Sequence, residues 1–393
     1  LPFDILDATK LIPEEVVPLE GIGKLVLNRN PDNFFAETEQ VAFHPGHVVP
    51  GIDFTEDPLL QGRLFSYTDT QLLRLGGANF HEIPVNRPRC PMHNFQRDGI
   101  RRMDVNKGRV SYEPNSLQPE GPRECPIHGF KTQPTADLGP KVRERSETFA
   151  DHYSQARQFF RSQTEPEQRH MIGALTFELG KVETAAVRSR MLGHLMLIDK
   201  TLGTEVATRL GMEDQVDAIT PARKPIDLAP SDAVSILKKW VPTLKGRQVG
   251  VLVADGSDAA LVNKLVKAIE KEGATAAIIA PKIGGATLKG GTKRAADQQL
   301  RGAPSVMFDA VALVLSEEGA EELVWQAEAI NWIRDAFGHL KVIGMTAAAQ
   351  PLLDKAAVEE DEGIIDLAGS GVAAFIDAAK QGRIWDREPK LRD

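Results

Sequence analysis

The sequence predicts a multidomain protein in which an α+β region is followed by a doubly wound α/β domain. Three observations lead to this prediction. Residues 246–393 alternate short apolar runs with amphipathic stretches, which is typical of a parallel sheet covered by helices on both faces. Residues 151–212 have a helical period, whereas residues 1–87 mix short β-like runs with loops rich in Pro and Gly. With 393 residues and 42% hydrophobic content, the chain has enough apolar material for two or three cores.

The N-terminal region carries one predicted strand, at residues 24–28, and one predicted helix, at residues 58–75. Asp57 is a preferred N-cap residue, a proline follows it at the first helical position, and Gly76 suits the helix end. The apolar content of this helix predicts that it is buried. Residues 88–150 have little periodicity and many Pro, Arg and Gly, so we expect a segment that wraps over a neighbouring surface.

Helices are predicted throughout residues 151–212. Thr164-Glu-Pro-Glu is a helix start signal, and the helix that it opens is expected to end near Gly180. Gly203 is expected to break the helical pattern that follows, which covers residues 182–202 and 206–210.

The C-terminal part of the chain begins after a predicted linker at residues 213–245, which contains four prolines. Strands are predicted at residues 249–253, 276–280, 310–315 and 341–345. Helices are predicted at residues 258–271, 320–337, 350–357 and 371–381, and a Gly-rich excursion at residues 281–305. This alternation over residues 246–393 resembles the flavodoxin-like fold.

Composition excludes several classes of function. A net charge of −8 argues against a nucleic-acid partner, and we interpret the basic clusters at 87–109 and 141–145 as solvated or domain-contacting surface. No apolar run approaches 18 residues, so no membrane span is expected. Two cysteines in 393 residues argue against a disulfide scaffold and favour a cytoplasmic location.

The candidate site lies on the helix at residues 58–75. At about 100° per residue, Arg63, Tyr67, Gln71 and Arg74 share an arc of roughly 80°. A phenol flanked by two permanent cations favours its phenolate form, and a phenolate is a hard ligand for ferric iron and a known axial ligand of haem. Arg74 would suit a haem propionate, because guanidinium pairs bidentately with carboxylate. The alternative is an ordinary core helix with a buried tyrosine beside its arginines.

This part of the chain also resembles a known family. Residues 63–71 and 74–80 are similar to the proximal haem signature of the haem catalases, and the resemblance extends over residues 5–215. Further matching runs lie at residues 28–37, 43–53, 83–88 and 93–99. Because a C-terminal domain follows, the resemblance is to the large-subunit catalases.

The resemblance implies roles for six residues. Tyr67 is the proximal iron ligand, Arg63 its charge partner and Arg74 a propionate partner, with Gln71, Phe43 and His44 also at the cofactor. Most catalases carry Asp where this chain has His44; some large-subunit members carry His there and crosslink it to the ligand tyrosine, alongside haem d. His44 is therefore either crosslinked to Tyr67 or a hydrogen-bonded loop histidine, and the cofactor is either haem b or haem d.

By the same resemblance, residues 1–87 form part of an antiparallel β-barrel and the activity is disproportionation of hydrogen peroxide to water and oxygen. The family's distal His and its partner Asn lie in the N-terminal half of the polypeptide, and none of the nine histidines here sits in such a motif. We therefore expect this chain to be the C-terminal portion of a longer polypeptide. Its expected partners are the N-terminal half of that polypeptide and further copies of the chain, assembled as a tetramer. The competing hypothesis is an inactive portion that acts as an oligomerisation scaffold.

Other motifs are weaker. Two Cys-x-x-His pairs in an irregular segment suit tetrahedral zinc, although their spacing is unusual; they comprise Cys90, His93, Cys125 and His128. Ser316, beside Glu317, occupies a position like that of the catalytic cysteine of class I amidotransferases, but the favoured reading is a non-catalytic domain. The Asp255–Asp258 turn could hold an anion at a helix start, although it lacks the glycines of a dinucleotide site.

Overall fold

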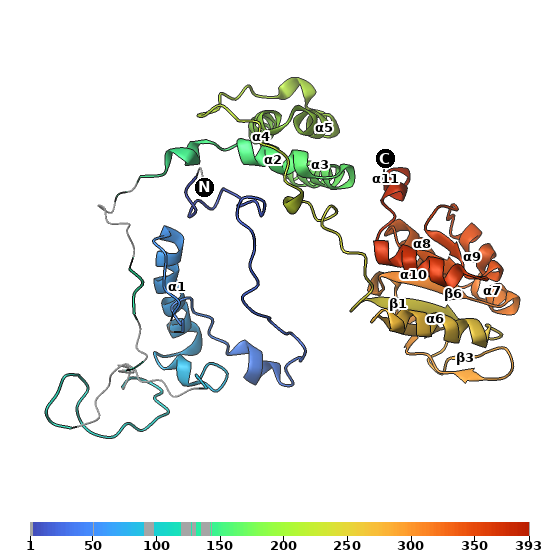
Figure 1. Cartoon of the computed structure of the whole chain (residues 1–393), viewed down its shortest axis with the longest axis horizontal. Coiled ribbons are helices and arrows are strands. Elements are labelled where there is room, and N and C mark those ends of the chain that lie inside the picture. The colour runs from blue at the N-terminus through green and yellow to red at the C-terminus, as the bar shows by residue number, and fades with distance from the viewer. Residues whose placement is uncertain are drawn as a thin grey trace. The chain divides into compact units, whose positions relative to one another are not determined.

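A computed structural model describes residues 3–49, 51–89, 98–118, 127, 131–134, 142 and 144–392. The chain divides into two compact units (Figure 1). The first comprises Leu1–Lys10 and Leu19–Phe149, and the second comprises Leu11–Pro18 and Ala150–Asp393. Each unit is described by itself below.

The first unit contains one long helix, α1 (Pro58–Leu75), and short helical turns at η1 (Phe35–Glu39) and η2 (Phe80–Glu82). The caps of α1 are the predicted ones. The Asp57 carboxylate accepts a hydrogen bond from the Leu59 amide at 3.1 Å, and Gly76 ends the helix with φ of 77°, where a glycine is favoured.

The strand predicted at residues 24–28 is not formed. These residues are unpaired, and Leu25 and Leu27 are 87% and 89% exposed. A strand is stable only when a neighbour completes its hydrogen bonds, and every strand in the described residues lies between Gln248 and Asp366.

The predicted burial of α1 was also wrong. Among its residues only Gln71 is fully buried, while Phe65 and Leu73 are 79% and 86% exposed. The helix forms because its caps and spacing are local, but no described residue of this unit covers most of its apolar side chains.

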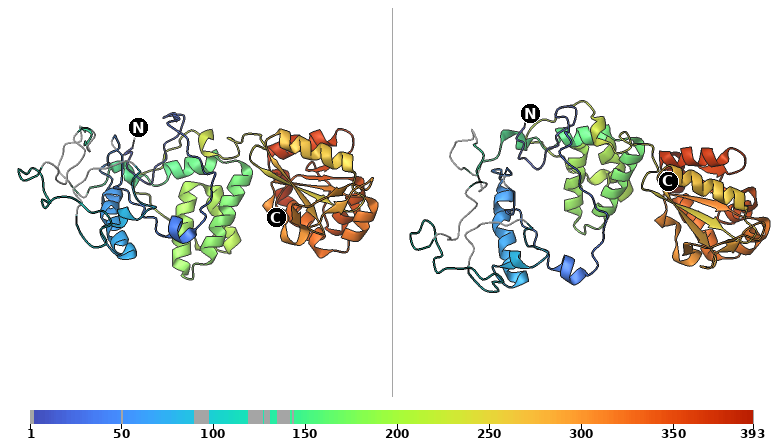
Figure 2. Two further views of the ribbon diagram at one scale, coloured as in Figure 1. Left: turned by 90° about the horizontal axis from the view of Figure 1, so that it is seen from below. Right: turned by 60° about the horizontal axis from the view of Figure 1, so that its bottom comes forward.

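The second unit contains a helical region whose four helices pack against one another (Figure 2). They are α2 (Ser154–Ser162), α3 (Glu165–Gly180), α4 (Ala185–Ile198) and α5 (Lys200–Leu210). Leu192, Leu195 and Val206 are at most 1% exposed in the core between them. The break after α4 comes at Asp199, not at Gly203 as predicted.

Gly203 instead lies inside α5, where the helix approaches α4 closely. A Cβ at this position would lie 2.7 Å from the Met196 amide nitrogen. The glycine thus permits close helix packing rather than ending a helix.

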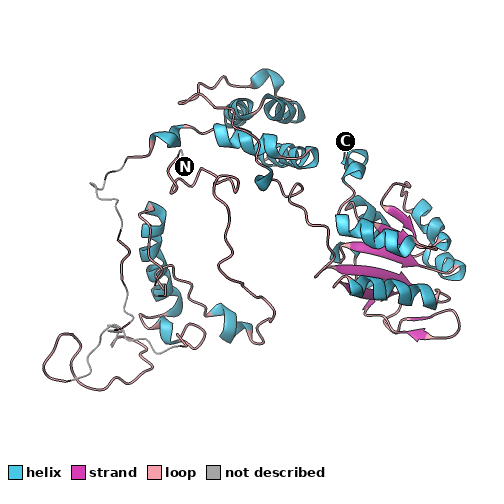
Figure 3. Cartoon of the chain, viewed as in Figure 1, coloured by secondary structure: helices cyan, strands magenta, loops and turns pink. Residues whose placement is uncertain are grey.

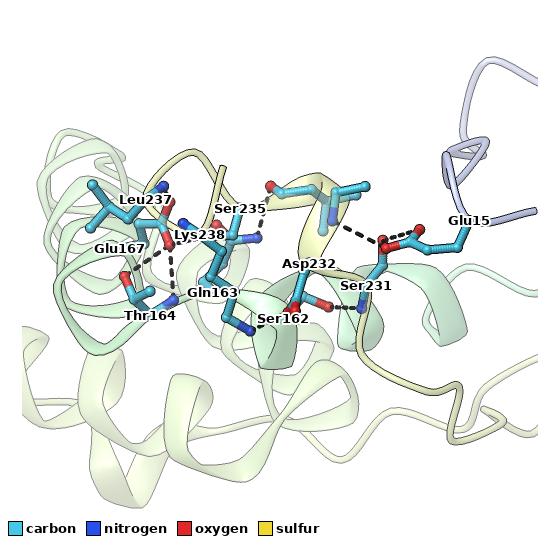
Figure 4. A network of polar contacts seen from close by, with 12 residues as sticks. Glu15, Ser162, Gln163, Thr164, Glu167, Ser231, Asp232, Ser235, Leu237 and Lys238 are labelled. Carbon is cyan, nitrogen blue, oxygen red and sulfur yellow. Dashed lines mark hydrogen bonds and ion pairs between the residues drawn. The ribbon is translucent and has the colours of Figure 1, made fainter. Parts of the chain in front are cut away.

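A polar network fixes the linker to the start of α3 (Figure 4). Thr164 and Glu167 form the predicted capping box. The Glu167 carboxylate also accepts hydrogen bonds from the Ser235 hydroxyl at 2.8 Å and the Leu237 amide at 3.1 Å. One carboxylate therefore stabilises both the helix start and the fold of the linker.

The same linker also holds the segment Leu11–Pro18. The Ser231 amide donates to the Ser162 hydroxyl at 2.8 Å, and the Ser231 hydroxyl donates to the Glu15 carboxylate at 2.8 Å (Figure 4). Gln155 adds a pair of hydrogen bonds to the backbone of Leu11. This segment is thereby part of the second unit, although it lies more than 130 residues away in sequence.

We expect Glu167→Gln to lower the free energy of unfolding of the helical region by about 2 kcal/mol, because hydrogen bonds to a charged acceptor are replaced by weaker neutral ones. Burial acts to raise the pKa of Glu167, but hydrogen bonds from Thr164, Leu237 and Ser235 outweigh it and lower that pKa. The stabilisation is therefore present above the unfolded-state pKa and lost as pH falls through the folded-state pKa.

Urea unfolding followed by circular dichroism at several pH values measures this effect. Glu165→Gln is the matched control, because Glu165 lies in the same first turn with its side chain 92% exposed. Equal losses in the two variants would contradict the role of the network.

The C-terminal part of this unit is a parallel sheet of six strands in the order β5-β2-β1-β6-β7-β8 (Figure 3). The strands are β1 (Gln248–Val253), β2 (Thr275–Ala280), β5 (Gln298–Gln299), β6 (Ala310–Val314), β7 (Ile343–Met345) and β8 (Ile364–Asp366). The four predicted strands are confirmed, whereas β5 and β8 are too short to produce a clear sequence pattern. The Gly-rich excursion contains the hairpin of β3 (Ala286–Thr287) and β4 (Lys293–Arg294).

Helices cover both faces of this sheet and form two cores. α6 (Ala259–Lys271) and α10 (Gly371–Gln381) pack on one face. The other face carries α7 (Glu317–Leu323), α8 (Ala327–Gly338) and α9 (Gln350–Lys355). The single helix predicted at 320–337 is therefore two helices, α7 and α8. The last described helix is α11 (Glu388–Arg392).

A buried arginine joins the C-terminal segment to this domain. Arg387 is 1% exposed and binds the Asp361 carboxylate with two hydrogen bonds, of 2.6 and 2.8 Å. It also donates to the carbonyl of Lys341 at 2.9 Å, and its guanidinium carbon lies 4.1 Å from the centre of the Phe337 ring. Each of the three guanidinium nitrogens therefore has an acceptor, and one face of the group has an aromatic partner.

Candidate functional site

The predicted tyrosine and arginine meet on one face of α1. The Arg63 guanidinium donates to the Tyr67 phenol oxygen at 3.2 Å, and its carbon lies 5.0 Å from the centre of the tyrosine ring. Residues four apart lie one above the other on a helix, so this pairing follows from the spacing alone. The cation is placed to stabilise negative charge on the phenol oxygen.

A second pair, one turn further along α1, holds the preceding loop. Gln71 donates to the Phe43 carbonyl at 3.0 Å, and Arg74 donates to the Glu39 carbonyl at 2.7 Å and to the Val41 carbonyl. Arg74 also donates to the Gln71 side-chain oxygen at 2.8 Å. The Phe43 ring then packs edge-on against Tyr67, with ring centres 5.5 Å apart.

His44 lies in this loop and contacts the residue after the tyrosine. Its Nε2 is 2.6 Å from the Thr68 hydroxyl, and its Nδ1 accepts a hydrogen bond from the Gly46 amide at 2.8 Å. Partial burial of the ring lowers the pKa of His44 below its usual value. The structure thus shows His44 as a hydrogen-bonded loop histidine.

The six predicted residues therefore gather in one place, but with two distinct tasks. Tyr67 contacts both Arg63 and Phe43, Gln71 and Arg74 attach the loop to the helix, and His44 binds Thr68. Both terminal nitrogens of Arg74, the expected propionate partner, bind oxygens of the chain in this structure.

Two residues that help to build the site were missed. Asn86 accepts from the Ala42 amide at 2.7 Å and donates to the Gln40 carbonyl at 2.8 Å, so it also holds this loop. Thr68 binds His44. Both residues lie within runs that carry the family resemblance, Asn86 in 83–88 and Thr68 in 63–71, and this was the available signal.

The weaker candidates in the C-terminal domain have structural tasks. The Ser316 hydroxyl accepts from the Gly319 amide at 3.0 Å as the N-cap of α7 and donates to the Asp255 carbonyl at 2.7 Å. The Asp258 carboxylate accepts from the amides at the start of α6, so it occupies the place that an anion would take. Neither group is placed as a nucleophile or an anion site.

Cys90, His93, Cys125 and His128 lie outside the described residues. Within the described part of the chain, no group of three or more His, Cys, Asp or Glu side chains is arranged to hold a metal ion. No helix among the described residues has both the length and the apolar character needed to cross a membrane.

Comparison with known protein families gives three matches in order along the chain. Residues 1–119 match the catalase model, residues 146–210 the catalase-related immune-responsive model, and residues 245–389 the model of the C-terminal domain found in long catalases. The chain belongs to the catalase family. The third match places it with the long catalases, as the resemblance in the sequence indicated.

Individual catalases are similar over nearly the whole chain. Catalase C of Rhizobium meliloti is 52% identical over 99% of this chain, catalase HPII of Pseudomonas aeruginosa 45% over 98%, and catalase-2 of Bacillus subtilis 44% over 98%. The chain spans only 55–56% of the length of these relatives.

Catalases are haem proteins, and haem is the cofactor that the family assigns to this chain. The Tyr67 environment fits an iron ligand. Within the described residues, the phenol oxygen is bonded to a cation and to no carboxylate, and the ring is only partly buried, so the oxygen is open to a further partner.

Proposed function

We propose that this chain supplies the proximal half of the haem site of a catalase that converts hydrogen peroxide to water and oxygen. The observation that carries the proposal is the Arg63–Tyr67 pair on α1, inside the segment that matches the catalase model. The relatives are named catalases, but because the chain spans little more than half of their length, the activity of the whole protein is a proposal for this chain.

In this proposal Tyr67 ligates the iron and Arg63 stabilises the phenolate by its charge. Bound haem supplies the redox-active iron with which peroxide exchanges electrons. Phe43 restricts the tyrosine ring from the side, and Gln71 holds the Phe43 backbone. Arg74 acts first as a clamp on the loop, and its bonds there use three of the five N–H groups of the guanidinium, so it can also contact a propionate.

The finer features of the family resemblance enter the proposal too. They are a His44 that is either crosslinked to Tyr67 or hydrogen-bonded in its loop, haem d or haem b as the cofactor, distal His and Asn residues supplied by the N-terminal half, assembly as a tetramer, and a cytoplasmic location. The antiparallel barrel belongs here as well. The strand order β2-β1-β6-β7-β8 supports a flavodoxin-like C-terminal domain, because that fold has the order 2-1-3-4-5.

We also propose five regions along the chain. They are a barrel and proximal helix at 1–87, a wrapping segment at 88–150, a helical domain at 151–212, a linker at 213–245 and a flavodoxin-like domain at 246–393. The matches at 146–210 and 245–389 and the two cores around the parallel sheet support the last three regions.

The second candidate function is a structural scaffold without activity of its own. The engaged Ser316 hydroxyl and the self-contained cores of the C-terminal domain favour a stabilising task for that domain. The two candidates differ in a simple measurement on the purified protein. A Soret band and oxygen release from peroxide are expected for a catalase, and their absence would favour the scaffold. Mass spectrometry of every polypeptide in the same sample identifies what assembles with the chain.

We expect Arg63→Leu to keep the fold and to weaken haem binding by about tenfold, because one charge-assisted contact to the phenolate is lost. Titration of the Soret band measures this. Arg63→Lys is the control, since it keeps the positive charge and should retain most of the affinity. Equal affinity in the wild-type and leucine proteins would contradict the charge-partner role.

A further inference from the structure

The loop that precedes α1 is fastened to it through a continuous chain of hydrogen bonds. The Gly46 amide lies 2.8 Å from His44 Nδ1, His44 Nε2 lies 2.6 Å from the Thr68 hydroxyl, and that hydroxyl lies 3.1 Å from the Leu64 carbonyl. The two ends of the chain are backbone groups with fixed roles: an amide can only donate, and a carbonyl can only accept.

These fixed ends determine where the protons lie. Because the Gly46 amide donates to Nδ1, that nitrogen must carry a lone pair. A neutral imidazole then has its proton on Nε2, which donates to Thr68. The Thr68 hydroxyl is left free to donate to the Leu64 carbonyl, so every donor has an acceptor. The opposite tautomer would place two hydrogens between Gly46 and His44.

The packing around the imidazole also restricts its orientation. A Cβ at Gly46 would lie 2.8 Å from His44 Cε1 and 3.0 Å from Nδ1, so the close approach of the loop requires glycine at this position. The His47 ring stacks on His44 with centres 4.5 Å apart and planes 12° apart, and Phe80 stacks on His47 in turn. The ring is therefore held in its plane and against the helix.

We propose that Thr68 is a positioning residue for the Tyr67 site: its hydroxyl and the Gly46 amide together hold His44 as the neutral Nε2–H tautomer, and the bond from His44 to Thr68 sets the loop that carries Phe43 against the phenol ring. The link to haem rests on the proposed function, whereas the tautomer does not. Thr68 follows Tyr67 in the sequence, so its side chain leaves the helix about 100° away from the tyrosine ring. Thr68 therefore acts on the site through His44 and the loop.

Long-range ¹H–¹⁵N correlation spectra of histidine rings test the proposal on the full chain, prepared without haem. His44→Gln identifies the His44 signals. The wild-type protein is expected to show the Nε2–H pattern at neutral pH. Thr68→Val removes the acceptor of the Nε2–H and leaves only the Gly46 amide to select the tautomer, so a mixture of tautomers is expected, whereas Thr68→Ser, which keeps the hydroxyl, is expected to show the wild-type pattern.

Thr70→Val is the matched control, because this threonine is exposed on the same helix. Gly46→Ala provides an independent variant, and it is expected to displace the ring and lose the pattern. A wild-type Nδ1–H pattern, or an unchanged Nε2–H pattern in Thr68→Val, would overturn the inference.

Haem titration of the same variants tests the consequence for the site. Thr68→Val is expected to bind haem more weakly or with a shifted Soret band, and Thr68→Ser is expected to behave as the wild type. An unchanged titration in a valine variant that has lost the tautomer would overturn the positioning role. A wild-type chain with the Nε2–H pattern that takes up no haem would contradict the proposed function and leave the hold of Thr68 on His44 established.

Discussion

Tyr67→Phe is expected to abolish haem retention. The substitution removes the one group on this face of α1 that can become an anionic oxygen ligand, since Arg63 and Arg74 are cations and Gln71 is neutral and bonded to the Phe43 carbonyl. The fold should persist, because α1 depends on its caps and the Phe43 ring can still pack against phenylalanine. Soret absorbance per mole of protein after gel filtration measures the effect.

Tyr112→Phe is the control, because it removes an equal phenol from a side chain that is 56% exposed and distant in sequence from α1. It should retain haem fully. A Tyr67→Phe protein that keeps its Soret band and its oxygen release would show that another residue ligates the iron.

Arg387→Leu is expected to lower the free energy of unfolding of the C-terminal domain by about 3–5 kcal/mol, the usual cost of breaking a buried ion pair from one side. The cation is 1% exposed, and its loss strands the Asp361 carboxylate and the carbonyls of Phe337 and Lys341. Leaving a buried acceptor without a donor costs more free energy than the original hydrogen bond contributed to stability, because water cannot reach the acceptor and replace the donor.

Urea unfolding monitored by tryptophan fluorescence measures the loss. The double variant Arg387→Met with Asp361→Leu should recover a large part of it, since replacing both partners by apolar groups leaves no stranded charge. A single variant within about 1 kcal/mol of wild type would mean that water reaches Asp361 once the guanidinium is removed.

Much of the fold could be predicted because its signals are local. Asp57 and Gly76 bound α1, Thr164 and Glu167 begin α3, and four buried strands appear as short apolar runs. The Arg63–Tyr67 pair was predictable for the same reason, since residues four apart meet on a helix whatever surrounds it.

Other features depend on partners that are distant in the sequence. No described residue pairs with residues 24–28, where a strand was expected, and these residues stay exposed. Glycine is a weak helix former, which led to the prediction of a break at Gly203, but this residue lets α5 approach Met196 closely. Both predictions were wrong because they used local preference alone, and a long-range contact, missing or present, decided the outcome.

The sequence by itself determined the helix that carries Tyr67, the cation beside it and the family to which they belong. Tertiary structure alone decided what Arg74 and His44 do: Arg74 clamps the loop through backbone carbonyls 33 and 35 residues away, and His44 binds Thr68 across 24 residues. The physical reason is that helical spacing follows from backbone geometry, whereas a hydrogen bond between distant segments exists only once the chain has brought donor and acceptor together.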